Sequence, residues 1–188
     1  MPKSINLSKL YDTLDAVIVN FCRDEEISEL KLQKGIFLFI WQYAERNAED
    51  PMELLKQFQF APYKEGPFSD YIHGQLEVLG HEGDLQIVKG SNGIKLKSSK
   101  KSESKYDLKD AEKRLFDEIR QVVSKTGPKE LAFFIYYNPT IPKQLKAFFA
   151  FKSEMKDEFR KNKKLYLGSL LRHDLIDEDA YALMYNER

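Results

Sequence analysis

The sequence predicts a mainly α-helical protein with a winged-helix-like element and further helices after it. Apolar residues recur at helical spacing through most of the 188 residues. In one region the pattern changes to two short β-like runs separated by an Asn-Gly pair, which is a strong hairpin signal. Helices followed by such a hairpin have the order of a winged helix. We therefore expect a small β-hairpin wing at about residues 85–97.

Two helices are expected at the start of the chain. Apolar residues over about 6–21 follow the spacing of one helix face. Ser28 has the position of an N-cap, although Lys31 leaves the capping box incomplete. The helix over 29–47 carries apolar residues on nearly all sides, which predicts a central position. A short helix is expected from Asp50-Pro51, because proline is tolerated in a first turn.

A non-helical segment separates these helices from the third one. Residues 58–67 contain two prolines and one glycine, which exclude a regular helix and predict a loop. Residues 68–79 return to a helical pattern, and Gly80 and Gly83 are expected to end it. Two short strands, 85–88 and 94–97, then form the wing.

The polar run SSKKSESK after the wing is the one plausible boundary in the chain. We expect a winged-helix-like portion over 1–97, a flexible linker over 98–106 and a helical portion over 107–188, packed together as one compact unit. The helices expected after the linker run over 107–125, 129–137, 141–162, 163–174 and 177–185. The long basic helix 141–162 should turn five apolar residues to the core, namely Phe148, Phe149, Phe151, Met155 and Phe159.

Composition excludes several classes of protein. Thirty basic and thirty acidic residues give no net charge, which excludes a uniformly basic nucleic-acid coat. The single cysteine, Cys22, cannot form an intrachain disulfide and suits a reducing compartment. The start MPKSINLSKL lacks the apolar core of a signal peptide, and no apolar run approaches the roughly 20 residues that span a bilayer. We therefore expect a cytoplasmic protein without membrane contact.

Catalytic signatures are missing from the sequence. It contains no phosphate-binding glycine loop, zinc-protease helix or nucleophile elbow. The three histidines do not have metal-ligand spacing, and Cys22 is interpreted as a small buried apolar residue. The sequence therefore predicts no enzyme, no catalytic residue, no cofactor and no metal site.

Lysines of the wing and linker leave nucleic-acid binding open as an alternative. From residue 85 to residue 105 there are six lysines and one glutamate. Against this, the exposed face of the third helix carries Asp70 and Glu77 but no Lys or Arg, which disfavours base readout. Surface lysines can also simply keep a hairpin soluble and guard its edges. The candidate nucleic-acid-binding residues are Lys89, Asn92, Lys95, Lys97, Lys100 and Lys101.

Two segments carry a family resemblance. The run KLQKGIFLF over 31–39 and the later run FQFAPYKEGPFS over 58–69 resemble the SocA/Panacea superfamily of phage-associated proteins and antitoxins, especially its YwgA-like branch. The resemblance covers about residues 28–88, with departures at Gly35 and Glu65. It implies a mostly helical fold and the binding and blocking of a toxin protein, and it implies no catalytic residues. The matching signature residues are Leu32, Gln33, Lys34, Tyr63, Gly66 and Pro67.

The signature also has a physical interpretation. Gln33 and Lys34 interrupt an apolar helix, and a buried glutamine needs hydrogen-bond partners, so we expect one of them to pin the proline loop against the helix. The same residues could serve as scaffolding alone. The sharper hypothesis adds a partner-binding surface formed by Tyr63, Lys64, Ser69 and His73.

The function predicted from these observations is a non-enzymatic, antitoxin-like protein that binds and neutralises a partner protein. The alternative is a winged-helix transcription regulator that contacts DNA through the wing lysines. Self-association into a homo-oligomer remains open.

Overall fold

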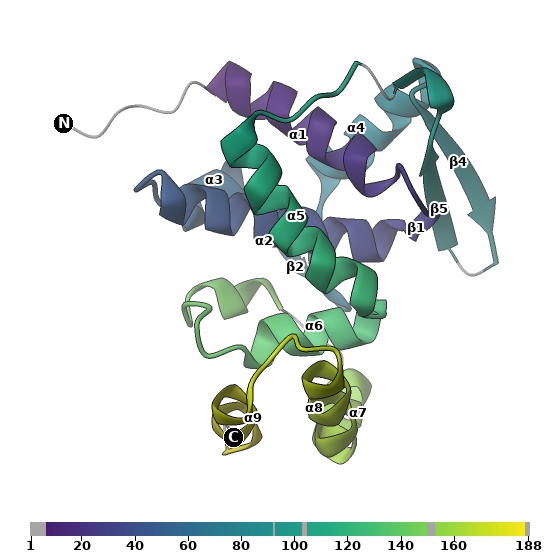
Figure 1. Cartoon of the computed structure of the whole chain (residues 1–188). Coiled ribbons are helices and arrows are strands. Elements are labelled where there is room, and N and C mark those ends of the chain that lie inside the picture. The colour runs from purple at the N-terminus through teal and green to yellow at the C-terminus, as the bar shows by residue number, and fades with distance from the viewer. Residues whose placement is uncertain (1–6, 92, 103–104, 150–152, 187–188) are drawn as a thin grey trace.

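A computed structural model describes residues 7–91, 93–102, 105–149 and 153–186. The chain is mainly helical, as predicted, with two small antiparallel sheets (Figure 1). The α-helices are α1 (Leu7–Phe21), α2 (Glu29–Arg46), α3 (Pro51–Gln57), α4 (Asp70–His81), α5 (Asp110–Lys125), α6 (Pro128–Tyr137), α7 (Ser153–Lys161), α8 (Lys163–Arg172) and α9 (Glu178–Asn186). The strands are β1 (Ile27–Ser28), β2 (Phe60–Tyr63), β3 (Gly66–Ser69), β4 (Leu85–Gly90) and β5 (Gly93–Ser98), and two 3₁₀ turns are η1 (Lys100–Ser102) and η2 (Leu145–Phe148).

The first half of the chain has the element order of a winged helix, with α3 and the strands β2 and β3 inserted between α2 and α4. After α1, β1, α2 and α4, strands β4 and β5 form the predicted wing, which projects from the body in Figure 1. The sequence did not reveal β1, which pairs with β5 through Ile27 and Leu96 and gives the sheet order β1-β5-β4. Gly93 has φ +99°, as a tight hairpin turn requires, and Asn92 lies outside the described residues.

Helix α2 is the central element, as its apolar surface predicts. It contacts α1, α3, α5 and α6 as well as β3, and Figure 1 shows α5 crossing it. Ser28 caps its start by accepting a hydrogen bond from the Lys31 backbone N–H. Helices α1, α2 and α5 approach closely at Gly35 of α2. A Cβ atom there would lie 3.0 Å from Phe21 Cζ of α1 and 3.2 Å from Val123 Cγ2 of α5. A larger residue would overpack this crossing.

A cluster of phenylalanines joins the two halves of the chain and corrects one prediction. The Phe37 ring of α2 meets the rings of Phe60, Phe148 and Phe149 edge to face, at centroid distances of 5.6, 5.7 and 5.7 Å. The predicted long basic helix over 141–162 is wrong, because the chain forms η2, leaves helical geometry at Phe149 and starts α7 at Ser153. This path lets two consecutive phenylalanines pack on Phe37.

The other residues that were predicted to face the core from that helix differ in burial. Phe159 is buried and Met155 is half-buried, whereas Phe151 lies outside the described residues.

The predicted proline loop is a β-hairpin. Strands β2 and β3 pair from Phe60 with Ser69 to Tyr63 with Gly66, and Pro62 stands opposite Pro67. A two-stranded ribbon accommodates these prolines because each strand has a free edge. Gly66 has φ +111° at the turn. The third helix consequently starts at Asp70 instead of Phe68.

The segment 98–106, predicted as a flexible linker, makes defined contacts at both ends. Ser98 belongs to β5, and its backbone N–H donates to Cys22 O at 2.7 Å. At the other end, Lys105 Nζ and Tyr106 Oη donate to the buried Asp84 carboxylate at 2.6 and 2.7 Å. The described residues at the two ends of this segment are therefore anchored, Ser98 by Cys22 O and Lys105 and Tyr106 by Asp84.

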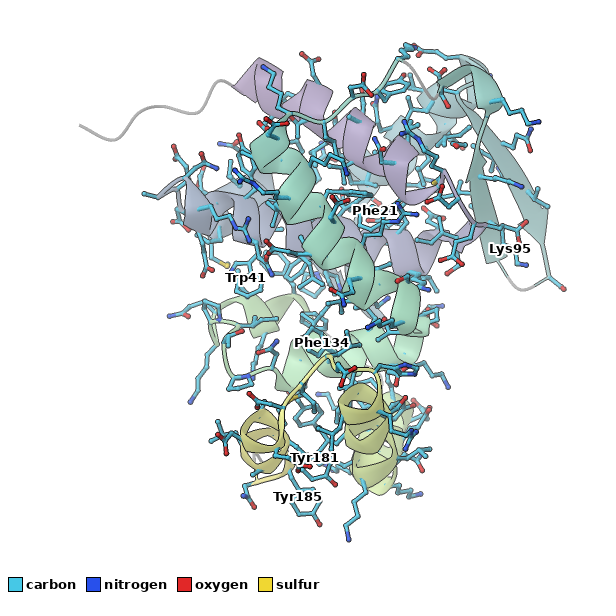
Figure 2. The ribbon with its side chains drawn as sticks, viewed as in Figure 1. Phe21, Trp41, Lys95, Phe134, Tyr181 and Tyr185 are labelled. Carbon is cyan, nitrogen blue, oxygen red and sulfur yellow. The ribbon has the colours of Figure 1, made fainter. Side chains whose placement is uncertain are left out.

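The last helices form a layer below α2 and α5. The predicted helices 107–125, 129–137, 163–174 and 177–185 correspond to α5, α6, α8 and α9, with ends that differ by at most three residues. Trp41 of α2 and Phe134 of α6 lie where α2, α5 and α6 meet (Figure 2). Tyr181 and Tyr185 mark the end of the molecule opposite the wing (Figure 2). No helix in the described ranges is long and apolar enough to cross a membrane.

The close approach at Gly35 predicts a contrast between two helix glycines. Alanine is a better helix former than glycine by about 1 kcal/mol. At Gly74 of α4, a Cβ atom would have no neighbour within 4 Å, so Gly74→Ala should stabilise the protein by about that amount. Gly35→Ala should instead destabilise it by about 1–3 kcal/mol, because Phe21 and Val123 are buried and cannot move away freely. Urea unfolding of both variants checks this, and equal stabilisation by both would contradict it.

Candidate interaction site at the proline hairpin

A buried amide joins the hairpin to the central helix. The Gln33 side chain donates from Nε2 to Ser69 O and accepts from Ser69 N–H, both at 3.1 Å. Gln33 and Ser69 are fully buried. The primary amide thus pairs with the end of β3 as a neighbouring strand would, and it satisfies backbone groups that would otherwise be orphaned. The pinning interaction expected from the sequence is present and is made by Gln33.

Ser69 has a second role at the same point. Its Oγ donates to Phe58 O at 2.5 Å and accepts from Ile72 N–H at 3.0 Å, so it is the N-cap of α4. The prediction that Ser69 contributes to a partner-binding surface is wrong. The Ser69 hydroxyl caps α4 and closes the hairpin, and the side chain is buried, so a partner cannot contact it.

Above this buried pair, the other predicted partner-binding residues form one continuous strip. Lys64 Nζ lies 5.4 Å from the Tyr63 ring centroid, and the Tyr63 ring lies 5.2 Å from Phe68. The Phe68 ring lies 6.0 Å from His73, which bonds to Glu29 Oε1 through Nδ1 at 2.6 Å. We call Tyr63, Lys64, Phe68 and His73 the hairpin strip. Tyr63 is 38% exposed, and the side chain of His73 is 41% exposed.

Sequence reasoning missed two members of this arrangement. Phe68 falls within the predicted third helix, but it belongs to β3 and links Tyr63 to His73. The Gly-Pro pair directly before Phe68, which is typical of a turn or a short strand, was the available signal. Glu29 starts α2 and is nearly buried beside His73. No local pattern relates Glu29 to His73, which is 44 residues away.

Lys34 lies on the other side of the hairpin turn and is almost fully buried, at 2% exposure. Its stem packs under Gly66, where a Cβ atom would lie 3.3 Å from Lys34 Cε. Its Nζ donates to Leu30 O at 3.1 Å. Burial lowers the pKa of this ammonium to about 8, an effect that Glu65 partly opposes. Leu32 and Pro67 are also buried, so within the signature only Tyr63 is exposed.

The residues proposed for nucleic-acid contact are distributed over different faces. Lys95 and Lys97 alternate with the buried Leu96 along β5, so they point away from the core. Lys89 instead lines the groove between the wing and α4, together with Ile94. Lys100 is exposed on η1, whereas Asn92 and the side chain of Lys101 lie outside the described part of the chain.

Ion pairs also reduce the positive charge that was counted in the sequence. Lys95 Nζ lies 2.7 Å from Glu26 Oε1, and Figure 2 shows Lys95 on the wing, toward its turn. Lys105 is paired with Glu82 and Asp84, and it holds the pKa of Asp84 below its ordinary value. Asp70 is exposed at the start of α4, where the negative charge would face phosphate.

Cys22 fits its interpretation as a buried apolar residue. The side chain is fully buried, and burial raises the pKa of the thiol to about 12, which keeps it protonated. Within the described ranges, no group of three or more His, Cys, Asp or Glu residues could hold a metal ion.

Comparison with known proteins identified no matching family model, no matching curated protein and no matching solved structure.

The buried amide pair predicts a large effect for Gln33→Leu. Leucine has a similar volume but no polar side-chain atoms, so Ser69 N–H and C=O lose their partners. This should lower the free energy of unfolding by about 1–3 kcal/mol for each buried group. Urea unfolding should show this loss, and amide exchange over 58–72 should accelerate. Gln42→Leu, a half-exposed position on the same helix, should change stability by less than about 0.5 kcal/mol. Unchanged stability and exchange in Gln33→Leu would contradict the pinning role.

The burial of Lys34 predicts how the stability of the protein depends on pH. Its folded pKa of about 8 lies below the 10.5 of an exposed lysine, so the unfolded chain binds more protons between these pH values. Stability should therefore rise as pH increases from 8 to 10.5, by up to about 3 kcal/mol from this group. Lys34→Met should lack this increase, since it has nothing to titrate. Unfolding free energies of both proteins at several pH values check this, and parallel pH curves would contradict it.

Proposed function

We propose that this protein is a non-enzymatic, antitoxin-like regulator that binds a partner protein through the hairpin strip. The observation that carries the proposal is an exposed aromatic and cationic strip mounted on a buried amide pair. Tyr63 and Lys64 stand at the hairpin, while Gln33 holds the end of the same hairpin to the central helix.

The chemistry of the strip favours a protein partner. Tyrosine offers a large apolar face with a polar tip, and such residues dominate the binding energy of protein interfaces. The hairpin is fixed before binding, so little conformational entropy is lost when a partner docks. The strip has one lysine and one histidine, with Glu29 beside the histidine, and it lacks the concentrated positive charge that nucleic acid requires.

The resemblance to the SocA/Panacea superfamily supports the same proposal independently. The motif residues Tyr63, Gly66 and Pro67 build the hairpin, and Gln33 and Lys34 underlie it. Neutralisation of a toxin by binding is the activity that this resemblance implies.

Co-expression with the neighbouring open reading frame tests the proposal. We expect the neighbour to be toxic alone, and to be bound and neutralised in the presence of this protein. Tyr63→Ser should weaken that complex by at least about thirtyfold, the size of an interface hot spot. Tyr185→Ser removes a tyrosine of similar exposure on α9, outside the hairpin strip, and should leave binding unchanged. A non-toxic neighbour without a complex, or equal effects of the two variants, would contradict the proposal.

DNA binding is the second candidate, favoured by the wing that projects from the body with Lys89 and Lys97 exposed. If these lysines contact phosphates, replacing both with alanine should reduce the slope of log affinity against log salt by about 1.8. The pair Lys113→Ala and Lys156→Ala removes the same charge elsewhere and should not change the slope. A salt-titrated binding assay on the upstream DNA of its own gene checks this, and equal slopes would exclude the wing as a contact.

A further inference from the structure

A cavity of about 530 Å³ lies under the hairpin turn, where α2 meets the later helices. Its lining comes from α2, the β2–β3 turn, the start of α6, α7 and α8. The size falls within the range of small-molecule pockets, which is about 300–1,000 Å³. The lining includes Leu30, Lys34, Glu65, Pro128, Met155 and Tyr166.

Lys34 brings a buried cation to the wall of this cavity. An ammonium has three donors, and within the described residues Nζ makes one hydrogen bond, to Leu30 O. No carboxylate of those residues lies within 4 Å of it. At neutral pH the group is mostly protonated, because its pKa of about 8 is still above 7. Glu65 offsets only part of the cost of burying this charge, and a bound anion in contact with Nζ would offset more of it.

Two of the other charged residues that line the cavity, Lys129 and Glu130, already have partners, whereas Glu65 is the acid whose charge acts on Lys34. Glu130 Oε2 accepts a hydrogen bond from Gly127 N–H at 3.3 Å. Lys129 Nζ lies 2.9 Å from Glu158 Oε2, and Tyr166 Oη donates to the same carboxylate at 2.7 Å. Among the described residues that line the cavity, Lys34 is therefore the cation without an acid in contact.

The remaining walls define the kind of ligand. Leu30, Pro128 and Met155 are apolar, and Tyr166 contributes its ring because its hydroxyl is already bonded. Glu65 and Glu130 also line the cavity and would repel a dianion such as a phosphate monoester about twice as strongly as a monoanion. One negative charge on an apolar body therefore fits this lining best.

We propose that this cavity binds a small monocarboxylic acid, whose carboxylate accepts hydrogen bonds from Lys34 Nζ and whose apolar body lies against Leu30, Pro128 and Met155. This site is separate from the hairpin strip, and it does not depend on the strip being a protein-binding surface. Lys34 acts here as a binding residue and undergoes no chemistry.

The test uses the full-length protein with 4-phenylbutyrate and its neutral analogue 4-phenylbutyramide as probes. Isothermal titration calorimetry should give a Kd of about 1 mM or tighter for the acid and at least tenfold weaker binding for the amide. Lys34→Met should weaken binding of the acid at least tenfold. We expect Lys34→Met to fold, because an apolar side chain costs less to bury than a charged one, and its urea unfolding curve separates loss of the site from unfolding. Lys56→Met removes an exposed lysine at the end of α3, away from the cavity lining, and should bind the acid like the wild type.

A second measurement reports on Lys34 itself. The pKa of Nζ, followed by NMR of the lysine side chain, should rise when 4-phenylbutyrate binds, because a carboxylate stabilises the charged amine. Equal affinity for acid and amide, full binding by Lys34→Met, no binding of the acid, or an unchanged pKa would each overturn the proposal.

Discussion

The pairing of the Gln33 side-chain amide with the backbone of Ser69 is the interaction on which the arrangement of the first half depends. It joins the central helix to the residue that both ends β3 and caps α4. A buried amide that satisfies two backbone groups gives the hairpin one position, since any shift would leave polar groups unpaired. The strip of Tyr63, Lys64, Phe68 and His73 is therefore presented on a rigid support.

Two adjacent polar residues of α2 differ in how their polar atoms are satisfied. Gln33 has its donor and acceptor both used by the hairpin, which is what a structural role requires. Lys34 is equally buried but makes a single hydrogen bond to a carbonyl within the described residues and faces a cavity. Two neighbouring residues of α2 therefore have different roles: Gln33 holds the hairpin in place, and Lys34 is the residue proposed to bind a ligand. The proline hairpin connects them, because its end meets Gln33 and its turn covers Lys34.

The wing shows why a count of charges differs from a charged surface. Six lysines against one glutamate indicated a basic wing and linker. In the fold, Glu26, the residue before β1, forms an ion pair with Lys95, and Asp84 forms one with Lys105. Strand alternation then separates Lys89 from Lys95 and Lys97. Acids that are distant in sequence weaken the field that the local composition predicts.

Local spacing and turn chemistry were enough to predict the helices with a strong one-sided or all-round apolar pattern, the Asn-Gly wing and the need of Gln33 for a partner. Three other features followed from the packing of distant segments. Strand β1 forms because β5 offers it an edge to pair with. The helix expected over 141–162 is broken, and Phe148 and Phe149 both pack on Phe37. His73 contacts Glu29, which is 44 residues away in the sequence. The energy of such long-range contacts outweighs the weak local preferences that a single sequence displays.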